Sequence, residues 1–265
     1  MRKPAVAENL SFWWGLMERF MSFDGVELAY MDSCGKGSPL FLLHGFTTSC
    51  MIDWLETGVY NALAGAGRRV VMLDMRGHGE SAKPHSAVSY CNRAMARDVH
   101  ALAGSLGISE FGLMGYSMGA KVAVEAALLS EGIRRLVLVG FAVYESGWQY
   151  NEAERLARVK NMLSRKSGKG DAYRLMAERY HGDRRAFAAR LEGALLPEFT
   201  ARDLLRIDVP VLVANGCDDE VGAQRAASYF IRGYGKTFGG DSRSILENQK
   251  FPGLVLEFLD SDEYV

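Results

Sequence analysis

The sequence Gly115-Tyr116-Ser117-Met118-Gly119 joins a short apolar run, residues 111–114, to a segment with helical spacing. A Gly-x-Ser-x-Gly motif between a strand and a helix is typical of a nucleophile elbow, a sharp turn that holds the serine above a sheet. The glycines remove side chains that would clash with the neighbouring backbone. The serine then lies at a helix N-terminus, where the helix dipole favours developing negative charge. The motif predicts that Ser117 is a nucleophile.

Short apolar runs alternate with longer helical patterns on both sides of this motif. This alternation is typical of βαβ units around a mostly parallel sheet. An Asp24-Gly25 turn indicates an opening hairpin. We predict strands at residues 26–31, 39–43, 70–73, 111–114, 135–139, 209–214 and 236–238. We predict helices at residues 51–64, 92–106, 117–130 and 249–259, with another from about residue 223.

The chain divides into a core and two additions. Residues 21–143 and 206–265 carry the sheet pattern and form the predicted α/β core. Residues 144–205 are rich in Arg, Glu, Ala and Leu, which predicts a helical cap inserted into the core. Residues 1–20 are an N-terminal extension, predicted to be helical because residues 10–20 are amphipathic. Glu8 and Asn9 interrupt its apolar stretch, so we do not expect a signal peptide.

Composition excludes several classes of partner. The net charge of −1 gives no basis for binding nucleic acid or an acidic membrane surface, and no apolar run reaches the length of a membrane span. Cys34, Cys50, Cys91 and Cys217 are scattered, which suits a reducing compartment and predicts a cytoplasmic protein. The acidic residues 218–220 have no suitably placed His or Cys, so we expect no metal and no cofactor. The oligomeric state stays open.

His44-Gly45-Phe46 follows the predicted strand at residues 39–43. In this architecture the backbone N–H groups of Phe46 and Met118 are expected to face one site and form an oxyanion hole. We predict that His44 braces this loop and takes no part in catalysis.

The loop Asp74-Met75-Arg76-Gly77-His78-Gly79-Glu80-Ser81 follows the next predicted strand. We expect an ion pair between Arg76 and Asp74 to tie it to the scaffold. His78 is interpreted as a satisfied loop histidine, with a role as a substitute base left open.

These motifs, in this order, resemble the α/β-hydrolase superfamily from about residue 21 onward. The segment Asp74–Ser81 with Lys83-Pro84-His85, the elbow and the small cap resemble a bacterial group of capped, serine esterase-like hydrolases. The resemblance implies the α/β-hydrolase fold, a mostly parallel eight-stranded sheet with helices on both faces and a small helical cap. It also implies a Ser…Asp…His triad in that chain order.

Two members of that triad have counterparts here. The resemblance assigns Ser117 as the nucleophile. The acid is expected in the turn Gly216-Cys217-Asp218-Asp219, where counting from Gly216 selects Asp219 and leaves Asp218 as the alternative.

The histidine is missing. The family places it in a loop before a phenylalanine that opens the last helix, and Gly239-Gly240-Asp241-Ser242 with Phe251 matches that frame. Ser242 occupies the histidine position, and no histidine follows His181. A serine hydroxyl is a poor nucleophile near neutral pH without an adjacent base.

Three explanations of Ser242 remain open: an engineered inactivation, a natural loss, or a histidine from elsewhere, His85 or His181. Two functions follow. The first is a serine hydrolase scaffold that acts on a small ester, thioester, lactone or amide, with activity impaired by the lost histidine. The second is a non-hydrolytic protein, ligand-binding or cyclase-type, that uses the same pocket. Tyr116 and Trp148 are the predicted substrate-binding residues for a small molecule.

Overall fold

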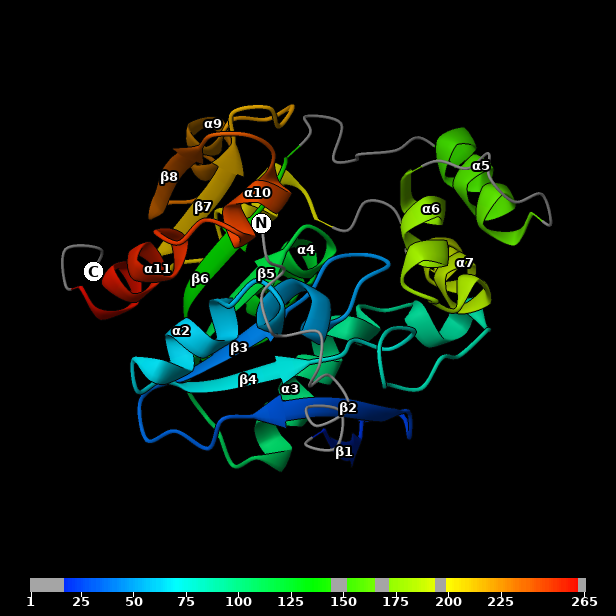
Figure 1. Cartoon of the computed structure of the whole chain (residues 1–265), viewed down its shortest axis with the longest axis horizontal. Helices are drawn as coiled ribbons and strands as arrows, with labels where there is room; N and C mark the ends of the chain where they lie inside the picture. Colours follow the sequence, from blue (N-terminus) through cyan, green and yellow to red (C-terminus); the bar gives the residue numbers. More distant parts are fainter. Residues whose placement is uncertain (1–16, 144–151, 165–171, 194–198, 262–265) are drawn as a thin grey trace, which may run out of the picture.

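A single eight-stranded sheet forms the centre of the molecule, with helices on both faces (Figure 1). The computed structural model describes residues 17–143, 152–164, 172–193 and 199–261. The strands are β1 (Glu18–Met21), β2 (Glu27–Asp32), β3 (Pro39–Leu43), β4 (Arg69–Leu73), β5 (Phe111–Tyr116), β6 (Ile133–Val139), β7 (Val211–Gly216) and β8 (Gly233–Phe238). The described helices are η2 (Met51–Leu55), α2 (Val59–Gly65), η3 (Ala87–Tyr90), α3 (Ala94–Ser105), α4 (Met118–Ala127), α5 (Glu152–Leu163), α6 (Ala172–Arg179), α7 (Arg184–Gly193), α8 (Ala201–Leu204), α9 (Ala223–Ala227), α10 (Ser242–Leu246) and α11 (Phe251–Asp260).

The strand order is β1-β2-β4-β3-β5-β6-β7-β8. The pairs β1–β2 and β2–β4 are antiparallel, and all later pairs are parallel. In register, Gly115 of β5 lies between Leu43 of β3 and Leu138 of β6. The parallel strands end at one edge of the sheet, so the loops that follow them meet there. Ligand sites of open α/β sheets lie at this edge.

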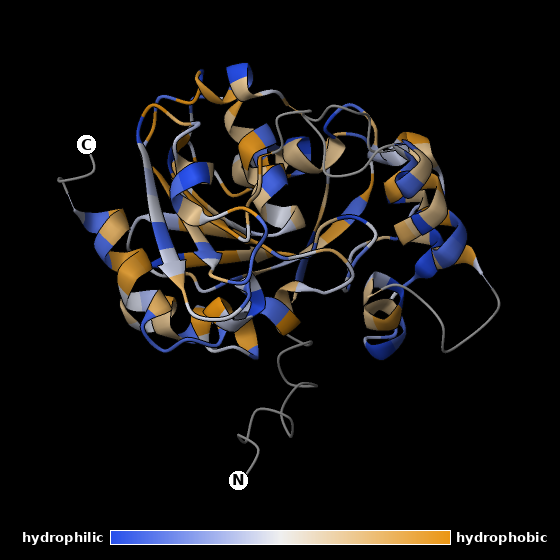
Figure 2. Ribbon diagram, turned by 90° about the horizontal axis from the view of Figure 1, so that it is seen from above, coloured by the Kyte–Doolittle hydropathy of each residue, from blue (hydrophilic) through white to orange (hydrophobic). Residues whose placement is uncertain are grey.

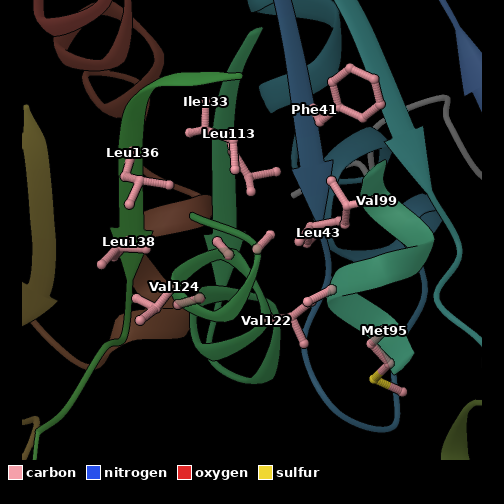
Figure 3. Close-up of a cluster of buried hydrophobic side chains, with 14 of the residues drawn as sticks. Phe41, Leu43, Met95, Val99, Leu113, Val122, Val124, Ile133, Leu136 and Leu138 are labelled. Atoms are coloured by element: carbon pink, nitrogen blue, oxygen red, sulfur yellow. The ribbon is translucent and has the colours of Figure 1, made fainter. Parts of the chain in front are cut away.

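Strand residues alternate between two cores, one on each face of the sheet. Leu113 and Leu138 belong to a cluster with α3 and α4, part of which Figure 3 shows. Met114 and Val139 belong to the opposite cluster, with η2, α2 and α11. Successive side chains of a strand point to opposite faces of the sheet, so a sheet covered by helices on both faces buries both sets of residues. Hydrophobic residues are accordingly concentrated along the central strands in Figure 2.

The observed fold confirms the predicted fold class, with local differences. The predicted hairpin exists, and Gly25 takes a φ of +81° in its turn. The single helix expected at residues 51–64 is two helices, η2 and α2. They are separated by Gly58, the N-cap of α2, whose φ of +82° is left-handed and therefore interrupts a continuous helix. The sequence pattern also missed α10, which begins at Ser242 itself.

The N-terminal extension is shorter than predicted. Glu18–Met21 form β1 and pair with β2, so the helical assignment of residues 10–20 is wrong at its end. Residues 1–16 lie outside the described part of the chain. Within the described residues, no helix combines the length and apolar character that a bilayer crossing demands.

The segment between β6 and β7, predicted as a cap, is helical where the structure describes it. Helices α5–α7 lie beyond the edge of the sheet and share a small hydrophobic cluster built around Met162, Ala177 and Phe187 (Figure 1). Phe46, from the loop after β3, packs against this cluster. The helical segment therefore contacts the core directly beside the predicted oxyanion hole.

Candidate active site

Ser117 occupies a strained turn between β5 and α4. Its φ of +52° and ψ of −108° lie outside the regions that non-glycine residues ordinarily adopt. A Cβ on Gly115 would lie 2.2 Å from the Gly119 carbonyl oxygen, and one on Gly119 would lie 2.2 Å from that of Leu43. Both glycines are therefore required by close backbone approach. The Ser117 N–H donates to the Val139 carbonyl at 2.8 Å, which holds the turn against β6.

The Ser117 side chain is half-buried at the N-terminus of α4. Among the described residues its hydroxyl makes no hydrogen bond, so none of these side chains accepts the hydroxyl proton. The elbow is thus present as a backbone structure, without the base that a serine nucleophile needs.

Phe46 follows β3, the strand next to β5, which brings its backbone to the N-terminus of α4. In the described structure, the N–H groups of Phe46 and Met118 donate no hydrogen bond, so both remain available to an incoming oxygen. The loop passes close to the elbow, since a Cβ on Gly45 would lie 2.9 Å from the Tyr116 ring. The role of the two N–H groups as an oxyanion hole stays a prediction.

His44 braces this loop, as expected. Its Nε2 accepts a hydrogen bond from the Met75 N–H at 3.0 Å, and its Nδ1 lies 2.8 Å from the Gly45 carbonyl oxygen. Because Nε2 accepts, Nδ1 carries the proton and donates to that carbonyl. His44 is fully buried, so it joins the β3 and β4 loops from the inside.

The turn after β7 holds Asp219 half-buried and leaves Asp218 exposed. The two carboxylate oxygens of Asp219 accept hydrogen bonds from two backbone N–H groups, that of Gly216 at 2.7 Å and that of Ser242 at 3.1 Å. Of the two candidate carboxylates in this turn, Asp219 is therefore the one that contacts the loop after β8. The exposed Asp218 side chain instead lies with its Oδ1 3.5 Å from the Cys217 Sγ.

Ser242 begins α10 and lies beside the elbow. A Cβ on Gly140, just after β6, would lie 2.7 Å from the Ser242 Oγ and 3.7 Å from the Tyr116 ring. Ser242 therefore sits over Gly140, between the ends of β6 and β8. The structure thus brings Ser242 next to Asp219 and close to Tyr116.

Asp53 and Arg243 form an ion pair that the sequence did not indicate. Asp53 is fully buried and also accepts hydrogen bonds from the Gly45 N–H at 2.8 Å and the Thr48 hydroxyl at 2.6 Å. Arg243 directly follows Ser242. The pair thus ties the loop after β3 to the start of α10. Its partners are 190 positions apart, and no local motif announces such a contact.

Tyr116 lies between these groups. Burial raises the pKa of its hydroxyl, and the nearby Asp53 carboxylate raises it further, against the opposing effect of Arg243. Tyr116 is therefore a neutral phenol at physiological pH. Trp148, the other predicted substrate-binding residue, lies outside the described residues.

The expected Arg76–Asp74 ion pair is wrong. Arg76 is fully buried and binds both oxygens of the buried Asp98, at 2.6 and 2.7 Å, and also Asp24. Asp74 instead accepts the backbone N–H groups of Cys50 and Glu80, each at 2.8 Å. The loop after β4 is anchored through Arg76, as predicted, but its partners are Asp98 of α3 and Asp24 of the β1–β2 turn.

Three other histidines, His78, His85 and His181, were considered as substitute bases. His85 Nε2 lies 2.9 Å from the Asp183 carboxylate, and His181 is exposed after α6. His78 is buried, with Nδ1 3.1 Å from the Arg76 carbonyl oxygen. Within the described residues none of the three contacts Ser117. The same part of the chain contains no group of His, Cys, Asp or Glu side chains suited to a metal ion.

Comparison with known proteins agrees with the observed fold. A family model described as the alpha/beta hydrolase fold matches residues 38–161. The crystal structure of a hydrolase from Pseudomonas aeruginosa PA01 superposes with a TM-score of 0.75 at 22% identity, covering 93% of this chain and 99% of that one. The family model and the superposition together show that the chain has the α/β-hydrolase fold.

Two curated relatives are hydrolases of small molecules by name. A 2-hydroxy-6-oxo-6-(2'-aminophenyl)hexa-2,4-dienoic acid hydrolase from Metapseudomonas resinovorans is 28% identical, over 81% of this chain and 79% of its own length. An N-formylmaleamate deformylase from Pseudomonas putida is 36% identical over 45% of this chain and 43% of its own length.

Proposed function

We propose that this protein is a serine hydrolase scaffold for a small ester, thioester, lactone or amide, which reacts by acyl transfer through Ser117. The observation that carries the proposal is the convergence of the elbow, the two backbone donors and the Asp219–Ser242 contact at one sheet edge. In the reaction, the Ser117 Oγ gives up its proton, to the triad base where one is present and otherwise to solvent, and attacks the substrate carbonyl carbon, while the N–H groups of Phe46 and Met118 stabilise the resulting oxyanion. Collapse of this intermediate breaks the bond to the leaving alcohol, thiol or amine, which takes up a proton, and water then releases the acyl group from Ser117.

The missing base limits this reaction. Loss of the histidine of a serine triad costs on the order of 10⁶ in rate, while an oxyanion hole and binding site alone retain about 10³–10⁴ over water. Ser242 cannot take the Ser117 proton near pH 7, because an alcohol is far too weak a base. We therefore expect the hydrolytic activity of this protein to be low. In the proposal, Asp219 would orient the imidazole of a histidine that this sequence lacks.

A non-hydrolytic protein of the same fold is the second candidate, either ligand-binding or cyclase-type. The observation that favours it is the unengaged Ser117 hydroxyl, since among the described residues neither Ser242 nor any histidine contacts it. In that case the pocket selects a ligand by shape and hydrogen bonds, and Ser117 is dispensable.

The decisive experiment compares hydrolysis of short-chain p-nitrophenyl esters by this protein, by Ser242→His and by Ser242→His/Ser117→Ala. Gly140 has no side chain, so it presents no Cβ to the residue at position 242. We expect turnover to rise by at least about 100-fold in Ser242→His, a fraction of the triad's full effect. The serine-to-alanine double variant should return to the blank.

Ser244→His is the matched control, because it adds a histidine to the same helix at an exposed position. Restored turnover in Ser242→His alone supports the hydrolase scaffold. An inert Ser242→His with unchanged thermal stability refutes it and favours the non-hydrolytic candidate.

The partner proposed for either function is a small molecule, as for the named relatives. We also propose a cytoplasmic, reducing location, which is supported by the four cysteines, all of them free.

A further inference from the structure

Asn215, the next-to-last residue of β7, is a buried amide directly before the turn that carries Asp219. Its side chain is 1% exposed and binds backbone groups of two other segments. Its Oδ1 accepts a hydrogen bond from the Phe141 N–H at 3.0 Å. Its Nδ2 donates to the Phe141 carbonyl at 2.8 Å and to the Val221 carbonyl at 2.7 Å. None of the roles predicted from the sequence includes this residue.

The partners of Asn215 fix which way its amide points. The Phe141 N–H requires the amide oxygen, and the two carbonyls require the NH₂ group, so the reversed amide would make none of these bonds. An aspartate of the same shape would bring a carboxylate against two carbonyl oxygens. The position therefore selects a neutral side chain that carries both an acceptor and two donors.

The bond from Asn215 to Val221 closes the turn that holds Asp219. It joins the residue before the turn to the residue at its far end. Inside the turn, the Gly216 N–H binds the Asp219 carboxylate at 2.7 Å. Because Gly216 directly follows Asn215, the buried amide fixes the backbone that orients the carboxylate.

The two bonds to Phe141 fasten this turn to the chain that leaves β6. The ladder between β6 and β7 continues as far as the Gly140 N–H, which donates to β7 at 3.0 Å. The Asn215 side chain then takes the place of the next ladder bonds, because it binds both backbone groups of Phe141. Phe141 is 1% exposed, and its ring packs against two other phenylalanine rings at centroid distances of 5.9 and 6.0 Å. The turn is thus attached to a well-packed part of the core.

Position 242 rests on the same chain. Gly140 directly precedes Phe141, and a Cβ on Gly140 would lie 2.8 Å from the Ser242 Cβ. The Ser242 N–H also binds the Asp219 carboxylate at 3.1 Å. One side chain, that of Asn215, therefore connects the turn of Asp219 to the segment beneath position 242.

We propose that Asn215 is a positioning residue, which holds the Asp219 carboxylate at a fixed distance from the side chain at position 242. The proposal rests on the proposed function, because it takes Asp219 as the acid. Asn215 is buried, so in this role it acts through the backbone and contacts no substrate. Loss of its three bonds frees the turn to shift relative to position 242.

The test uses the full chain carrying Ser242→His, in which the introduced imidazole reports on the carboxylate. Its pKa is measured by NMR of protein labelled with ¹⁵N-histidine, and the parent identifies the signals of the five native histidines. A nearby opposite charge favours the charged imidazole, so Asp219→Asn should lower this pKa by about 1 or more. Asn215→Leu, which is similar in size and removes all three bonds, should produce at least about half of that decrease.

Val213→Ala is the matched control. Val213 is fully buried two residues earlier in β7, on the same face of the strand, and its side chain makes no hydrogen bond. This variant lowers stability and should leave the pKa of the introduced imidazole unchanged. Asn215→Ser is a second, smaller variant, which cannot reach both Phe141 and Val221 and should lower the pKa in the same direction. An unchanged pKa in both Asn215 variants overturns the positioning role.

The titration does not depend on hydrolysis. If Ser242→His is inert and the imidazole pKa still falls in Asn215→Leu, the proposed hydrolysis fails and the positioning role stands. If Asp219→Asn leaves that pKa unchanged, Asp219 is not the partner of position 242, and the positioning role fails with it.

Turnover gives a second measure of the same role. In an active Ser242→His protein, Asn215→Leu should lower kcat on the order of 10²-fold at nearly constant KM, as expected when a group near the reaction is misplaced by about 1 Å. An unchanged kcat would overturn the positioning role and leave the proposed hydrolysis intact.

Discussion

The Oδ1 atom of Asp219 accepts a 3.1 Å hydrogen bond from the backbone N–H of Ser242. This contact joins the turn after β7 to the first residue of α10 and does not depend on the side chain at position 242. The other carboxylate oxygen is held by the Gly216 N–H at 2.7 Å. The acid is therefore oriented by the backbone alone, and a histidine introduced at this position would meet a carboxylate that is already in place.

Asp219 should accordingly matter as soon as a histidine is restored. In the Ser242→His background, Asp219→Asn is expected to lower ester hydrolysis on the order of 10⁴-fold, or to the level of the Ser117→Ala blank, because the imidazole loses its orienting carboxylate. Asp218→Asn is the control and should change turnover by less than about twofold, since that side chain is exposed. Equal losses in both variants would contradict the assignment.

Gly119 should be intolerant of any side chain. A Cβ there would lie 2.2 Å from the Leu43 carbonyl oxygen, so Gly119→Ala must displace backbone of β3 or α4. We expect the free energy of unfolding to fall by about 3 kcal/mol or more, as measured by urea denaturation. Gly104→Ala in α3, where nothing lies within 4 Å, should instead stabilise by roughly 0.5–1 kcal/mol. A stable Gly119→Ala would argue against the observed close approach.

The Asp53–Arg243 pair should contribute to the stability of the site. Asp53→Asn leaves the guanidinium without its buried charged partner, and breaking a buried pair costs about 3–5 kcal/mol. We expect the lower end, about 3 kcal/mol, because the Arg243 side chain keeps 29% of its exposure. Glu247→Gln removes the exposed partner of Arg243 and should change stability by less than about 0.5 kcal/mol. Similar losses in the two variants would show that burial is not decisive.

His78 should make stability fall in mild acid. Its pKa is lowered in the folded state, so below the ordinary value of 6.5 the unfolded chain binds a proton that the folded chain does not. Stability from this group is present above about pH 6.5 and is lost as the pH falls toward the folded pKa, by up to about 1.4 kcal/mol per pH unit.

The check is urea denaturation at pH 6.5 and 5.5. The pH-dependent loss should be smaller by roughly 1 kcal/mol in His78→Asn than in the parent, because the titrating group has gone. His100→Asn should retain the parent's dependence, since that variant leaves His78 intact. An unchanged dependence in His78→Asn would show that His78 is protonated at a similar pH in both states.

Much of the fold and part of the site were predictable from local pattern. The elbow glycines predicted the strand–helix junction at Ser117, which the structure shows, whereas the catalytic roles of Ser117 and Asp219 stay predictions. The helical start at Ser242 was missed, because Asp241 caps it by accepting the Ser244 N–H, a bond within a stretch that also suits a loop. The Arg76 partner was wrong because Asp74 is near in sequence, while Asp98 and Asp24 are near in space.

The sequence by itself determined the class of fold, and it carries the predictions that Ser117 is a nucleophile and that Ser242 occupies the histidine position, because each rests on the spacing of a few consecutive residues. Tertiary structure alone decided that Asp53 meets Arg243, that Phe46 packs against the helices between β6 and β7, and that Asn215 joins the turn of Asp219 to the chain after β6. Those contacts join segments distant along the chain. They exist only when the parallel strands bring their carboxyl ends to one edge, where burial makes each polar partner costly to lose.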